Sequence, residues 1–136
     1  MSERFRLGRS FKPFRRPWLW AGLWVLGIAA VVIASLVPAP ALPPVPPGGD
    51  KLEHFLAYAL LAAAAVQLYA RRPAWVGAGI ALVLLGIGLE YAQGTLTTTR
   101  MMDRWDALAN TIGVIAGLAT MLTPWRDALL RFDRRR

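Results

Sequence analysis

The chain contains no cysteine, so it can form no disulfide and offers no thiolate as a nucleophile or metal ligand. It has a single histidine, and its 8 acidic residues are outnumbered by 16 lysines and arginines, which gives a formal net charge of +8. The basic residues occur in short clusters between long uncharged runs and do not alternate with aromatic residues. This distribution argues against nucleic acid as a partner.

Apolar residues make up 56% of the 136 residues, and the mean hydropathy is +0.41, which is unusual for a water-soluble domain of this length. A helix needs about 20 mostly apolar residues to cross the hydrocarbon layer, because its backbone groups must pair within the segment. Four stretches meet or approach that length: 18–37, 51–70, 74–93 and 102–122. The sequence therefore predicts an all-α membrane protein with four transmembrane helices in an up-down bundle.

The other segments are short: a basic amino-terminal segment (1–17), a proline-rich loop (38–49) and a basic tail (123–136). A cleaved secretory signal is the alternative for the first apolar stretch, because small residues follow it. We favour an anchor helix over 18–37, because the apolar part of a signal is usually about 7–15 residues long.

The basic residues are divided unequally between the loops, and such residues are retained on the cytoplasmic side of a membrane. Thirteen of the 16 precede the first stretch, separate the second from the third, or follow the fourth. The other three are Lys51, Arg100 and Arg104. We therefore expect both termini in the cytoplasm, and we expect the basic ends to attract membrane lipids.

In this topology, ten polar or charged residues gather at the outer membrane face. We call them the polar cluster: Asp50, Lys51, Glu53, His54, Glu90, Gln93, Arg100, Asp103, Asp106 and Asn110. All except Glu53 are candidates for binding a ligand.

Residues three or four apart share one face of a helix, and Asp103, Asp106, Asn110, Gly113 and Gly117 follow this spacing. The two glycines form a GxxxG pair, which predicts close packing of this helix against the second or the third. Ionisable groups within a membrane are costly unless paired, so we expect Asp106 to face the bundle and to have a partner.

Three blocks of the polar cluster have a recurring spacing: Asp50-Lys51-x-x-His54, Glu90-x-x-Gln93 and Arg100-x-x-Asp103-x-x-Asp106-x-x-x-Asn110-x-x-Gly113. Over residues 50–122 this pattern resembles the signature of VanZ-like membrane proteins. The loop 94–99 is rich in threonine, whereas relatives often have a proline-glycine turn before the arginine. The resemblance implies a small multi-pass protein of the bacterial cytoplasmic membrane. The founding member of this family is associated with low-level resistance to the glycopeptide teicoplanin, so the resemblance also implies a role in the cell-envelope or glycopeptide response.

The residue types in the cluster suit the head of an anionic, lipid-linked envelope molecule. Arg100 and Lys51 can hold a phosphate, since an arginine binds phosphate through two parallel hydrogen bonds. His54, Glu90 and Asp106 are the candidate acids or bases, and Asp50, one turn before His54, could orient its ring. The sequence contains no recognisable nucleophile, so it leaves open whether a reaction is catalysed.

Other interpretations remain open at this stage. The cluster can be a structural network in which Arg100 and Lys51 neutralise the carboxylates, in a scaffold or partner for another membrane protein. Proton-linked transport is disfavoured, because Gln67 is nearly alone as a polar residue in the inner halves of the first three stretches. We expect no metal or other cofactor, although His54, Glu90, Asp103 and Asp106 suit zinc or manganese. The oligomeric state is open.

Overall fold

The structure is a computed structural model that describes residues 10–136. The first nine residues of the predicted basic segment, with three of its arginines, lie outside the described range. The described chain forms five α-helices and three short 3-10 helices, and it contains no β-strand. The all-helical prediction is confirmed.

The helices begin and end close to the predicted stretches. They are α1 (Pro17–Leu36), α2 (Gly49–Leu68), α3 (Arg72–Leu96), α4 (Arg104–Ala119) and α5 (Ala128–Arg135), with the 3-10 helices η2 (Ala39–Ala41), η3 (Thr120–Leu122) and η4 (Pro124–Asp127).

Several predicted helix boundaries differ from the structure by two or three residues, and α2 begins and ends two residues earlier than its predicted stretch. α3 is longer at both ends than 74–93, since Pro73 is compatible with the first turn of a helix and the hydroxyl of Thr97 donates to the carbonyl of Gln93 at 2.6 Å. α4 begins at Arg104 instead of residue 102, because the side chain of Asp103 accepts a hydrogen bond from the amide of Trp105 at 2.8 Å and so caps the helix.

Three helical segments are long and apolar enough to cross a membrane: α1, α3, and α4 together with η3. The chain is therefore a multi-pass membrane protein by helix length and composition. α2 has 20 residues but does not reach the same apolarity, because its first two turns contain Asp50, Lys51, Glu53 and His54.

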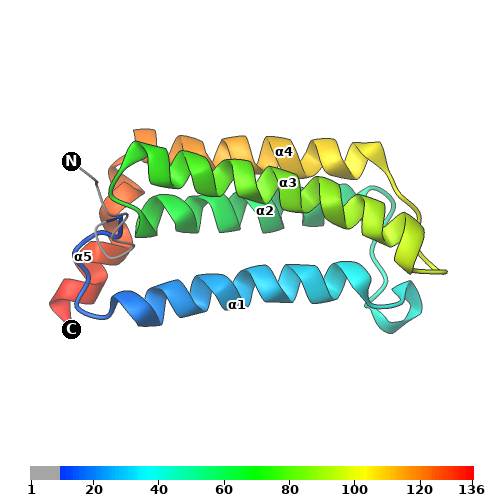
Figure 1. Ribbon diagram of the computed structural model, residues 1–136, viewed down its shortest axis with the longest axis horizontal. Coiled ribbons are helices and arrows are strands. Elements are labelled where there is room, and N and C mark those ends of the chain that lie inside the picture. The colour runs from blue at the N-terminus through cyan, green and yellow to red at the C-terminus, as the bar shows by residue number, and fades with distance from the viewer. Residues whose placement is uncertain (1–9) are drawn as a thin grey trace, which may run out of the picture.

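α2 lies at the centre of the bundle and packs most closely against α4 (Figure 1). Gly113 and Gly117 of α4 allow this approach. A Cβ atom on Gly113 would run into the carbonyl oxygen of Phe55, and one on Gly117 would lie 2.7 Å from the Cβ atom of Ala62. The GxxxG pair thus faces the second helix, which was one of its two predicted partners.

The hydrophobic core lies between α2, α3 and α4 and is formed by Tyr58, Leu61, Ala62, Leu82 and Val114. No residue of α1 is buried, and α1 runs along one side of the other three helices (Figure 1). The indole of Trp24 donates to the carbonyl of Leu61 at 2.9 Å and fixes α1 to α2.

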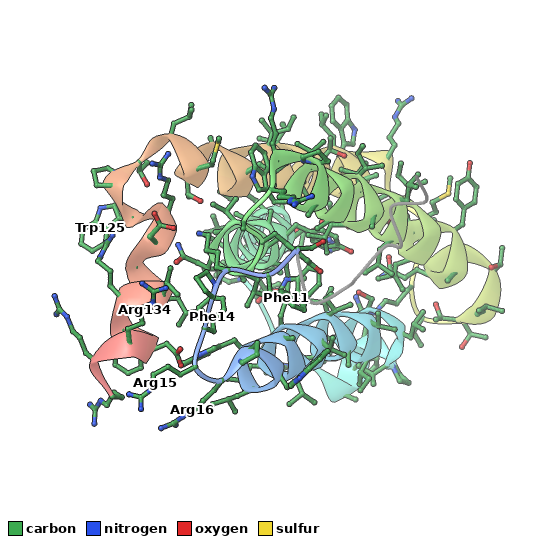
Figure 2. The ribbon with its side chains drawn as sticks, turned by 60° about the vertical axis from the view of Figure 1, so that its left-hand side comes forward. Phe11, Phe14, Arg15, Arg16, Trp125 and Arg134 are labelled. Atoms are coloured by element: carbon green, nitrogen blue, oxygen red, sulfur yellow. The ribbon has the colours of Figure 1, made fainter. Side chains whose placement is uncertain are left out.

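The end of the bundle opposite the polar cluster is also folded. We call it the basic end, and it consists of residues 10–16, 68–72 and 123–136. There α5 lies across the bundle, and Figure 2 shows Arg15, Arg16, Trp125 and Arg134 gathered at this end. Lys12 pairs with Asp127 at 2.9 Å, and Trp20 donates to Asp133 at 2.9 Å. The predicted tail 123–136 is therefore mostly helical and packed, because Asp133 is buried against the start of α1.

Candidate functional site

The polar cluster lies where the carboxyl ends of α1 and α3 meet the amino ends of α2 and α4 (Figure 1). Glu90, Gln93, Asp106 and Asn110 are buried, whereas Glu53 points to the surface. The structure thus brings together most of the residues that the spacing singled out, from three different helices and one loop.

Lys51 is the cation at the centre of the carboxylates. Its ammonium group lies 2.7 Å from Asp103, 2.5 Å from Asp106 and 3.1 Å from Asp50. The hydrogen bond from Lys51, followed by the bond from the amide of Trp105, lowers the pKa of Asp103. Asp106 therefore has the partner that its depth requires, and Lys51 joins the start of α2 to the start of α4.

His54 is held by α4. Its Nδ1 lies 2.9 Å from Oδ1 of Asn110, so Nδ1 donates to this amide oxygen, and its Nε2 lies 3.5 Å from Oδ2 of Asp106. Asn110 is itself pressed against Gly86, where a Cβ atom would come 3.1 Å from its Nδ2. The sequence suggested that Asp50 could orient the ring of His54. The carboxylate of Asp50 instead accepts a hydrogen bond from Lys51.

Glu90 fixes the loop that leads into α4. One of its carboxylate oxygens accepts a hydrogen bond from the backbone amide of Asp103 at 3.0 Å, and the residue is only 3% exposed. One turn later, Gln93 donates from its side-chain amide to the carbonyl of Ser35 at 2.9 Å. The end of α3 is thereby joined both to α4 and to α1.

Arg100 does not neutralise the carboxylates, and this part of the predicted ion-pair network is wrong. Its Nε donates to the carbonyl of Val37 at 3.2 Å and its Nη2 to the carbonyl of Ala34 at 3.1 Å. These carbonyls belong to the carboxyl end of α1, where backbone oxygens lack helical partners and carry partial negative charge. A guanidinium group has five N–H donors, and these contacts use two of them.

A cleft of about 140 Å³ opens between α1, α2 and α3 beside Arg100. Its polar lining consists of Arg100, Gln93, His54, Ser35 and the exposed carboxylate of Glu53, and Tyr58 and the last turns of α1 complete it. Sequence reasoning missed two contributors. Tyr58 is four residues after His54 and shares its helix face, and this spacing could have predicted its place in the site. Ser35 has the one side-chain hydroxyl in the run 18–37, which could have predicted that residue.

His54 lies between two unlike environments. On one side is the cleft, where Arg100 can bind an anion such as a phosphate and the exposed Glu53 is the one carboxylate of the lining. On the other side are Asp106 and Glu90, and each of the three residues has a possible ligand atom within 4.8 Å of the others. Asp103 is not part of this group, because its carboxylate faces Lys51. The arrangement could therefore bind an anion in the cleft while His54 transfers a proton.

Comparisons with known proteins give no relative: no family model matches the chain, and no curated protein or solved structure matches it either. The resemblance to VanZ-like proteins therefore stays a prediction from the three blocks of residues.

Proposed function

We propose that this chain is a VanZ-like protein of the bacterial cytoplasmic membrane that contributes to the envelope or glycopeptide response. In this proposal the cleft at the outer face recognises the anionic head of a lipid-linked envelope molecule. The proposal rests on the orientation of Arg100, which lines the cleft at the end of the bundle that carries the polar cluster.

The proposal requires four spans with both termini in the cytoplasm. A fourth span through α2 is supported by its 20 residues, which rise about 30 Å as a helix, and by its central position beside α4. The distribution of basic residues supports the orientation.

The absence of native cysteine makes this topology testable with single cysteines. Pro47→Cys and Thr98→Cys are expected to react with a membrane-impermeant maleimide in intact cells, whereas Thr123→Cys is expected to react only after permeabilisation. The opposite pattern would contradict the orientation, and labelling of Thr98→Cys and Pro47→Cys from different sides would contradict the fourth span.

The anionic ligand fits the cleft for a geometric reason. The carbonyls of Ala34 and Val37 hold the guanidinium at the edge of the cleft, so little side-chain freedom remains to be lost on binding. A second polar group on the cleft wall, His54, is fixed by Asn110 and can hydrogen-bond to the same head group.

The alternative is a scaffold in which the cluster is only structural. The contacts of Lys51 with Asp103 and Asp106 favour it, because they join α2 to α4 without any ligand. The two functions differ at Arg100, which makes no contact with those carboxylates: a scaffold needs only its two hydrogen bonds to the end of α1, whereas a working cleft also needs its free donors.

Complementation separates these functions. A strain lacking the gene is complemented with the wild type, Arg100→Ala, Arg100→Lys or His54→Ala, and glycopeptide susceptibility is measured at equal membrane abundance. Arg104→Ala is the matched control, since Arg104 is an exposed arginine at the same end. We expect Arg100→Ala and His54→Ala to lose the phenotype and Arg104→Ala to keep it. Full complementation by the first two variants would refute a working cleft.

A further inference from the structure

We propose that His54, Glu90 and Asp106 form a binding site for a divalent transition-metal ion, with zinc or manganese as the best match. This site shares His54 with the cleft, but metal binding does not depend on the identity of the anionic ligand or on the proposed function. It would place a cation between α2, α3 and α4, next to the wall of the cleft that His54 forms.

The distance between His54 and Asp106 suits a metal centre better than a hydrogen bond. The possible ligand atoms of the three residues lie within 4.8 Å of one another. His54 Nε2 and Asp106 Oδ2 are 3.5 Å apart, which is long for a hydrogen bond between them. Two ligands of a tetrahedral zinc ion, each about 2.1 Å from the metal, are separated by about 3.4 Å. This pair therefore already has the spacing of two zinc ligands.

The imidazole is prepared for such a role by its other nitrogen. Because Nδ1 donates to Oδ1 of Asn110 at 2.9 Å, the neutral ring has its lone pair on Nε2, which faces Asp106. Histidines that bind metals commonly have their second nitrogen hydrogen-bonded in this way, which fixes the tautomer and the direction of the ring.

Glu90 can supply the third ligand. The residue is only 3% exposed, and one carboxylate oxygen accepts a hydrogen bond from the amide of Asp103. Among residues 10–136 no hydrogen bond reaches its other oxygen, and no fully enclosed side-chain oxygen lacks a partner, so this oxygen keeps contact with solvent. It can therefore be reached by a proton or a cation.

The charge of the cluster also favours a cation. Three carboxylates, those of Asp50, Asp103 and Asp106, contact one ammonium group, and the carboxylate of Glu90 lies near that of Asp106. Arg100 does not balance this charge, because it is bonded to α1. Lys51 contacts Asp106 through Oδ1, while Oδ2 faces His54, so an ion can bind without displacing the lysine. One imidazole and two carboxylates form a ligand set typical of zinc or manganese, with further positions left for water.

Cobalt is a suitable probe, because its visible absorption reports coordination directly. The full chain is purified in detergent, stripped with a chelator and titrated with Co²⁺, and Zn²⁺ is then added as a competitor. We expect one Co²⁺ per chain and loss of the absorption when Zn²⁺ displaces it. His54→Gln, Glu90→Gln and Asp106→Asn should each abolish it, and Asn110→Ala should weaken binding by about 10- to 100-fold.

Glu53→Gln is the matched control, since Glu53 is an exposed carboxylate one residue before His54. It should bind Co²⁺ as the wild type does. Circular dichroism of each variant shows whether it is folded. Folded wild-type protein without stoichiometric Co²⁺ would overturn the proposal, as would equal absorption in folded variants of all three ligands. The titration contains no anionic lipid, so its failure leaves the proposed function of the cleft standing.

Discussion

Replacing Gly117 by alanine tests the close contact between α2 and α4 on which the site depends. The added Cβ atom would lie 2.7 Å from the Cβ atom of Ala62 and 2.8 Å from the amide nitrogen of Ala63, and it would also run into the carbonyl oxygen of Ala59. All three atoms belong to the backbone of α2 or are a Cβ atom, so no rotamer change relieves the overlap.

The size of the effect follows from these distances. An ordinary contact of 3.4 Å would require the two helices to move apart by about 0.7 Å at Ala62. Overpacking of this kind costs about 1–3 kcal/mol, while the higher helix propensity of alanine returns up to about 1 kcal/mol. We therefore expect the free energy of unfolding to fall by about 1–2 kcal/mol.

Unfolding in mixed micelles, followed by circular dichroism, measures this change. Gly88→Ala is the matched control, because Gly88 lies within α3 and a Cβ atom there would meet no atom within 4 Å. The control should be unchanged or more stable by up to about 1 kcal/mol. Equal stability of Gly117→Ala and Gly88→Ala would refute the close approach of α4 to α2.

Three further predictions concern the charged groups at the two ends of the bundle. Lys51→Met should lower the free energy of unfolding by about 1–2 kcal/mol, which is less than for a fully buried pair because the lysine side chain is 37% exposed. Lys51→Arg should lower the free energy of unfolding by less in the same micelle assay. Equal losses of stability in the two variants would contradict the account. At the basic end, the hydrogen bond from Lys12 lowers the pKa of Asp127 below its ordinary value of 3.8, so the folded state releases this proton more readily than the unfolded state. The stabilisation is therefore complete above about pH 4 and is lost as the pH falls through the lowered pKa. The protection of the amides of residues 10–16 against hydrogen exchange, relative to the intrinsic rate at each pH, should fall with pH in the wild type and should not change with pH in Asp127→Asn. Asp133→Ala should leave the Trp20 indole and the Arg15 amide without their acceptor and should lower the free energy of unfolding by about 1–3 kcal/mol. Trypsin should then cleave α5 faster than in Asp133→Asn, whose side-chain oxygen can still accept a hydrogen bond. Equal cleavage rates would argue against a packed tail.

Most of the bundle could be predicted from the sequence, because the signals were local. Uncharged runs of about 20 residues indicate helices that can cross a membrane, and the i, i+3 and i+4 spacing places Asp106, Asn110, Gly113 and Gly117 on one face. The fold at the basic end could not be predicted in this way. The packing of α5 depends on Asp133 meeting Trp20, a contact between residues 113 positions apart in the sequence.

The site was predictable as a list of residues and not as a set of contacts. The spacing brought Lys51, His54 and Asp106 to one end of the bundle, but it could not decide which cation faces which carboxylate. That outcome depends on α1, whose end offers two backbone carbonyls to Arg100 and so removes it from the acidic group. Every helix has free backbone carbonyls at its carboxyl end whatever its sequence, so no residue type in α1 predicts this contact.

Direct binding of a lipid phosphate tests the central claim, namely that the cleft recognises an anionic head group through Arg100. Purified wild-type protein, Arg100→Ala and Arg104→Ala are each titrated with a lipid phosphate and with the lipid alcohol of the same chain, and the bound fractions are measured by native mass spectrometry. We expect the wild type and Arg104→Ala to bind the phosphate about tenfold or more tightly than the alcohol, and Arg100→Ala to lose this preference. A wild type that does not distinguish the two lipids, or an Arg100→Ala variant that distinguishes them equally well, would contradict the account.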